Sequence, residues 1–99
     1  MKINDKDYLE KKEFVVKLNE VLNIAKPHLT CEFKLGEEIG QNVGSEYVVV
    51  TCANGYKYHV NVSCDSLAAV ALDVFRAIVA KWRIRIWDFV TQGGLYENI

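Results

Sequence analysis

The segment EYVVVTCANGYKYHVNVSC, residues 46–64, constrains the fold more than any other part of the chain. Two runs rich in valine and tyrosine flank the dipeptide Asn54-Gly55, and both residues of that dipeptide adopt positive φ readily. The pattern predicts a β-hairpin with a two-residue type I′ turn at Asn54-Gly55. Counting outward from that turn fixes the pairing of the two strands. It pairs Val50 with His59 and Val48 with Asn61 on one face, next to the pair of Cys52 and Lys57.

The first strand of this hairpin is apolar on both faces, because valines occupy positions 48, 49 and 50 in succession. A strand of this kind is typical of the centre of a sheet that is covered on both sides. The alternative is that both helices of the protein pack on the same side and leave an exposed apolar patch. The sequence leaves both arrangements open, and only the second would offer Val48 and Val50 to a partner.

The residues before the hairpin predict three further elements. Residues 28–35 alternate, which predicts a strand with Leu29, Cys31, Phe33 and Leu35 facing the core. Residues 36–45 carry three glycines and predict a long, mobile loop. Residues 4–26 predict a helix that Pro27 ends, with Lys11 on its solvated face. The core stripe expected for this helix consists of Phe14, Val15, Leu18, Val21, Leu22 and Ala25.

Residues 65–92 contain no glycine or proline and hold helical spacing from Leu67 to Phe89. They predict one helix of about 25 residues, with Asp65 or Ser66 as its N-cap. A second interpretation stays open, in which the helix ends near Trp82 and residues 83–89 form a fourth strand. We favour the single helix. The chain is then one domain, residues 1–99, of the α+β class: a helix, a three-stranded antiparallel sheet and a long C-terminal helix (α-β-β-β-α).

Composition limits the classes of partner and the compartment. Twelve basic and thirteen acidic residues give a net charge of −1, so no overall attraction to nucleic acid or to an anionic membrane follows. No segment has the pattern of a secretory leader, and no apolar run approaches the ~20 residues that span a bilayer. The three cysteines, Cys31, Cys52 and Cys64, are odd in number and widely spaced, which favours free thiols in a reducing cytoplasm.

The sequence offers little for catalysis or cofactor binding. Cys52, His59 and Cys64 match no zinc-ligand spacing. A catalytic pair of Cys64 and His59 would have to meet within about 3 Å, and the two positions have opposite parity along the strand. Glu37 and Glu38 lie in a glycine-rich loop that lacks the Lys-Ser/Thr ending of a phosphate loop. We therefore expect a protein that is not an enzyme and that holds no metal and no cofactor.

Basic and aromatic residues cluster in the C-terminal helix. Trp82 is interleaved with Arg76, Lys81, Arg83 and Arg85, a combination suited to phosphate contact and base stacking. This cluster gives the alternative function, a small nucleic-acid-binding regulator. It is not favoured, because the run is short and is bracketed by the acidic residues at 73 and 88.

A chain of this length that opens with MKIND, and that orders a helix, three antiparallel strands with a tight hairpin and a helical end, resembles the small phage-encoded anti-CRISPR proteins. The resemblance implies a non-enzymatic inhibitor that docks on a host effector complex such as a CRISPR nuclease. This chain differs from the commonest pattern of the family, in which dense acidic residues imitate nucleic acid, because its charges balance. Such an inhibitor would work through apolar and mixed contacts.

We therefore predict a cytoplasmic protein-binding module whose partner is another protein or a second copy of itself, the latter giving a dimer. The expected contact surface combines the outer hairpin face with the end of the C-terminal helix, where arginine and tryptophan favour strong contacts. The predicted partner-binding residues are Val48, Val50, His59, Asn61, Arg83, Arg85 and Trp87.

Overall fold

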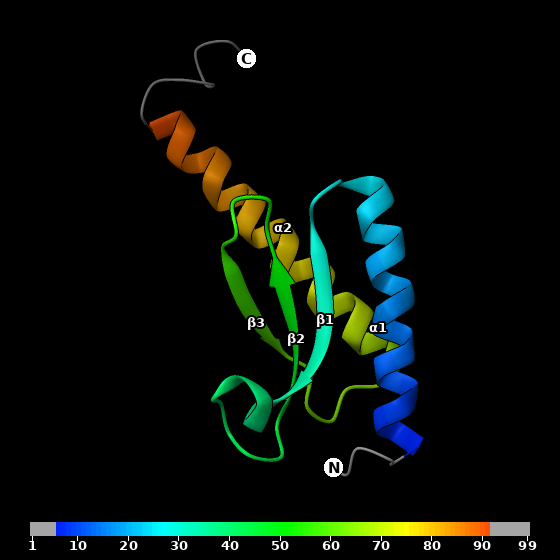
Figure 1. Ribbon diagram of the computed structural model, residues 1–99. Helices are drawn as coiled ribbons and strands as arrows, with labels where there is room; N and C mark the ends of the chain where they lie inside the picture. The colour runs from blue at the N-terminus through cyan, green and yellow to red at the C-terminus, as the bar shows by residue number, and fades with distance from the viewer. Residues whose placement is uncertain (1–5, 92–99) are drawn as a thin grey trace.

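The computed structural model describes residues 6–91, with side chains described as far as residue 81. The elements follow in the order α1 (Lys6–Ala25), β1 (Thr30–Leu35), the 3₁₀ helix η1 (Gly36–Ile39), β2 (Glu46–Thr51), β3 (Lys57–Asn61) and α2 (Leu67–Thr91). The strands form one antiparallel sheet in the order β1-β2-β3 (Figure 1). The predicted α-β-β-β-α layout is confirmed. Because α2 continues through residues 83–89, the alternative of a fourth strand there is wrong.

Helix α1 buries Val15, Leu18 and Leu22, as predicted, and the partly buried Phe14 packs against the same core, but the stripe also includes residues that were not predicted. Its buried side chains recur every three or four residues, and they are Tyr8, Lys11, Val15, Leu18 and Leu22. Val21, predicted to belong to the core, is 58% exposed, and Ala25 is exposed as well. The prediction was wrong for Val21 and Ala25, because it placed Lys11 on the solvent side and so rotated the apparent apolar face of the helix.

The β2–β3 hairpin turns through three residues, Ala53, Asn54 and Gly55, and not through the predicted two. The N–H of Cys52 donates to the carbonyl of Tyr56 (2.8 Å), and the N–H of Gly55 donates to the carbonyl of Cys52 (2.9 Å). Gly55 has φ 85°, whereas Asn54 does not have positive φ. This geometry fits a type I turn that ends in a left-handed residue. Pairing therefore shifts by one residue, so that Val48 lies opposite Val60 and Val50 opposite Tyr58.

The shifted register turns Val48 and Val50 into the core, where both have an exposed fraction of 0%. The prediction that these valines are exposed is therefore wrong. A slip of one residue moves every side chain of a strand to the other face. Full burial of a valine stabilises the fold by roughly 1.5–3 kcal/mol. The observed register is therefore favoured, because it buries both Val48 and Val50.

Both helices contribute to a single core on one face of the sheet, which answers the question that the sequence leaves open. In Figure 1, α1 runs alongside β1 and α2 crosses behind the sheet. The cluster joins Val15, Leu18 and Leu22 of α1, Val70 and Val74 of α2, and Cys31, Phe33, Val48 and Val50 of the sheet. The inward row predicted for β1 is confirmed, since Leu29, Cys31, Phe33 and Leu35 are all buried.

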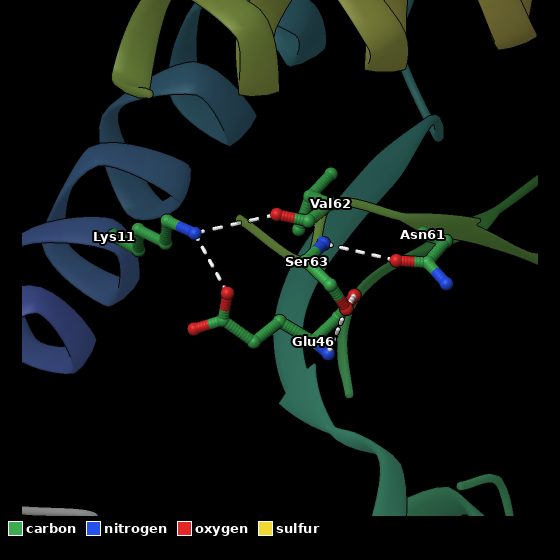
Figure 2. Close-up of polar contacts among 5 residues, drawn as sticks. All are labelled: Lys11, Glu46, Asn61, Val62 and Ser63. Carbon is green, nitrogen blue, oxygen red and sulfur yellow. Dashed lines mark hydrogen bonds and ion pairs between the residues drawn. The ribbon is translucent and has the colours of Figure 1, made fainter. Parts of the chain in front are cut away.

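A buried ion pair joins α1 to the start of β2 (Figure 2). Lys11 Nζ lies 2.7 Å from Glu46 Oε1 and also donates to the carbonyl of Val62 (3.3 Å). The two charged side chains are only 8% and 5% exposed. The second carboxylate oxygen, Glu46 Oε2, is buried without a hydrogen-bond partner in the part of the chain that the structure describes. The N–H of Glu46 donates to Ser63 Oγ (2.8 Å), which fixes the backbone beside the ion pair.

Residues 36–45, predicted as a long, mobile loop, form η1 and a closed turn. The N–H of Gly36 donates to the carbonyl of Ser45 (2.7 Å), and the N–H of Gln41 donates to the carbonyl of Gly36 (2.8 Å). A Cβ atom at Gly36 would lie 1.9 Å from the carbonyl oxygen of Asn42. The close approach of these two backbone segments therefore requires glycine at position 36.

The connection from β3 to α2 places a non-glycine residue in a left-handed conformation. Cys64 has φ 64° in a turn where the N–H of Asp65 donates to the carbonyl of Val62 (3.1 Å). Ser66 then caps α2, as predicted, because its Oγ accepts from the N–H of Ala69 (3.2 Å). Burial raises the pKa of Asp65 above its ordinary value of 3.8, and a hydrogen bond to Asp73 raises it further.

Candidate functional site

The structure separates the four hairpin residues that are predicted to share a partner-binding face. Val48 and Val50 lie in the core, so they are unavailable to a partner of the folded protein. His59 and Asn61 are exposed on the opposite face of the sheet. The His59 ring packs edge-on against Tyr47, with ring centroids 6.1 Å apart. Asn61 Oδ1 accepts from the N–H of Ser63 (2.9 Å).

The two basic side chains of α2 that the structure describes, Arg76 and Lys81, do not lie on one stripe of the helix. Arg83, Arg85 and Trp87 lie on the α2 backbone, but their side chains fall outside the described residues. Arg76 and Lys81 are both exposed. Five positions on an α-helix correspond to a rotation of about 140°, so these two side chains leave the helix in different directions.

Helix α2 is apolar on two faces, and one of them is exposed. Val70 and Val74 face the core with exposed fractions of 0%. A second row lies on the other side of the helix and remains substantially open to solvent: Leu72 is 50%, Phe75 40% and Val79 48% exposed. These three residues are spaced three and four apart, so they lie on one helical stripe. We call Leu72, Phe75 and Val79 the outer stripe of α2.

An apolar groove of about 850 Å³ opens beside the outer stripe. It lies at the end of the molecule where α1 meets β1 and where the β2–β3 hairpin turns (Figure 1). Pro27 and Leu29 line one side, and Ile78 and Val79 of α2 line the other. Tyr58 of β3 forms part of the wall, and burial raises the pKa of its hydroxyl to about 12. Val79 belongs both to the groove and to the outer stripe.

Lys81 of α2 contacts two tyrosine rings of the hairpin at this groove. Lys81 Nζ lies 5.7 Å from the centre of the Tyr56 ring and 5.4 Å from the centre of the Tyr58 ring. Both distances fall within the range of cation–π attraction. The contact therefore links the two tyrosine rings of the hairpin to α2.

The described residues assemble no recognisable reactive centre. Burial raises the pKa of the Cys31 thiol to about 11, which disfavours the nucleophilic thiolate. Cys64 is exposed before α2, and no hydrogen bond among the described residues joins it to His59, whose ring packs against Tyr47. The described part of the chain also contains no group of three or more His, Cys, Asp or Glu side chains that could hold a metal ion.

Sequence reasoning missed both the outer stripe and the groove. Residues 67–89 were interpreted as a single apolar helix, although the three-and-four spacing of Leu72, Phe75 and Val79 was a readable sign of a second apolar row. The groove had no such sign, because its walls come from residues 25–29, 52–58 and 78–81, which only the fold brings together.

Two further findings bear on function. Neither α1 nor α2, over the residues that the structure describes, has the length and apolar character that a membrane-spanning helix needs. Comparison of the chain with protein-family models, with curated proteins and with solved structures found no match.

Proposed function

We propose that this protein is a non-enzymatic binding module that docks on a larger protein through the outer stripe of α2. The observation that carries the proposal is the exposure of Leu72, Phe75 and Val79 on a helix whose opposite face is already packed in the core. Contiguous apolar side chains on a soluble protein mark interaction surfaces more often than scattered ones do. A helix with anchors at this spacing fits a partner that offers an apolar groove.

The three side chains are large enough to support a specific contact. Full burial of a leucine, phenylalanine or valine is worth roughly 1.5–3 kcal/mol, and about half of each side chain is still exposed. Covering the stripe would therefore contribute on the order of 1 kcal/mol per residue. Arg76 follows Phe75 and is exposed, which adds a residue type that is enriched at binding hot spots.

The proposed partner is a host effector complex such as a CRISPR nuclease, met in the host cytoplasm by an inhibitor of phage or mobile-element origin. The resemblance in size and layout to small anti-CRISPR proteins supports this class of partner. The balanced charge of the chain supports apolar docking over imitation of nucleic acid.

The experiment places a photocrosslinking amino acid at position 75 and, in a matched control, at position 24 of α1. Ile24 is 85% exposed and lies on a different helix, so it reports non-specific contacts. We expect crosslinking to one effector nuclease from position 75 and not from position 24, together with loss of nuclease inhibition in Leu72→Glu. Equal crosslinking from both positions, or full inhibition by Leu72→Glu, would reject the proposed surface.

Nucleic-acid binding through Arg76, Lys81, Arg83 and Arg85 is separated from this proposal by a filter-binding titration. Phosphate-driven binding weakens steeply as salt rises, and it should be reduced in Arg76→Gln. Tight, salt-sensitive binding of DNA or RNA by the wild-type protein would favour the regulator over the protein-binding module.

A further inference from the structure

The groove between the hairpin and α2 has the charge distribution of a site for an anionic ligand. Two lysines, Lys26 and Lys81, are among the groove residues, and no aspartate or glutamate is. Neither lysine forms an ion pair with a carboxylate among the described residues, whereas Lys11 and Lys34 do. The described side chains therefore leave the positive charge at the groove uncompensated.

The floor of the groove is apolar, and contacts between the hairpin and α2 support its walls. Leu29 is 5% exposed, and Ile78 packs against the core cluster, so the floor is continuous with the core. The position of Lys81 over the Tyr56 and Tyr58 rings links the aromatic wall to α2. The hydrogen bond from the N–H of Cys52 to the carbonyl of Tyr56 (2.8 Å) closes the hairpin above it. A site that is formed before binding loses less freedom when a ligand enters.

We propose that this groove binds an apolar monoanion, of which a medium-chain fatty carboxylate is the simplest example. The alkyl chain lies along Leu29, Ile78 and the tyrosine wall, and the carboxylate meets Lys26 and Lys81. A volume of about 850 Å³ is within the range of small-molecule sites. This binding does not depend on the proposed docking through the outer stripe, with which the groove shares Val79.

The test is isothermal titration of the full chain with decanoate and with 1-decanol, which share a chain length and differ in charge. We expect saturable 1:1 binding of decanoate and weaker binding of the alcohol. Lys26→Gln should weaken decanoate binding by about two- to fivefold, as expected for losing one partly exposed ion pair, and should leave 1-decanol unchanged. Ala25→Trp, which fills the groove from the end of α1, should abolish binding of both compounds.

Val43→Ser is the matched control, because Val43 is 82% exposed in the loop that precedes β2 and is not a groove residue. It should bind decanoate like the wild type. Circular dichroism of each variant verifies the fold, and Lys26→Gln changes only an exposed side chain. Absence of saturable decanoate binding, equal binding of the alcohol, or unchanged binding by Ala25→Trp would each overturn the proposal.

Discussion

Replacing Lys11 with methionine tests whether the buried ion pair organises the core. The substitution keeps the length of the side chain but leaves Glu46 buried, 5% exposed, without the cation 2.7 Å away. Breaking a buried pair by removing one partner costs about 3–5 kcal/mol, because the remaining charge is uncompensated. A domain of this size has a total stability of about 5–15 kcal/mol. Lys11→Met should therefore lose about a fifth or more of the free energy of unfolding.

The assay is urea unfolding of four proteins: wild type, Lys11→Met, Glu46→Leu and the double variant. Glu46→Leu should be destabilised by a similar amount, because it leaves the charged Lys11 buried without its carboxylate partner. The double variant should lie within about 1–2 kcal/mol of wild type, since an apolar pair of similar volume often replaces a buried ion pair without loss. The coupling energy between the two sites, which is the sum of the two single losses minus the loss in the double variant, should then be at least about 4 kcal/mol. Additive losses in the double variant, or a loss below about 1 kcal/mol in Lys11→Met, would refute this reasoning.

Three further substitutions test local features of the fold. Cys64→Gly should raise the free energy of unfolding by about 1 kcal/mol, measured by urea unfolding, because φ 64° is strained for cysteine and free for glycine. Gly36→Ala should lower it by about 2 kcal/mol in the same assay, because the new Cβ would meet the Asn42 carbonyl at 1.9 Å. Asp65 binds its proton more tightly in the folded state than in the unfolded chain, so its ionisation costs stability as pH rises above 3.8. Asp65→Asn should therefore raise the melting temperature at pH 7, and this gain should disappear below pH 3.8.

Local patterns predicted most elements but not the register that decides which side chains are exposed. Alternation from Leu29 to Leu35 identified the inward face of β1, and the absence of helix breakers from 65 to 92 identified α2. Asn54-Gly55 fits both a two-residue turn and the end of a three-residue turn. The choice between the two turns depends on which valines of β2 the helices cover. Tertiary packing decides this, and the local sequence does not show it.

Lys11 shows a second limit of sequence reading. A lysine within a helix is normally exposed, so its position one turn after Tyr8 on the core stripe carried no signal by itself. Its partner Glu46 is 35 residues away in the chain, at the first position of β2. Only the packing of α1 beside the sheet brings the two charges together, and without that pairing neither would be tolerated in the core.

The length of α2 relative to the sheet leads to a last prediction. Twenty-five residues span roughly 38 Å as a helix, whereas the six residues of β2 span roughly 20 Å. The helix therefore continues past the end of the sheet (Figure 1), and the described core cluster lies within residues 8–78. A chain that ends after Lys81 should keep a cooperative unfolding transition in urea, with a stability loss of less than about 2 kcal/mol. A chain that ends before Leu67 serves as the control and should not fold, because it lacks Val70 and Val74. If the chain ending after Lys81 unfolded without cooperativity, the second half of α2 would belong to the core and not extend beyond it.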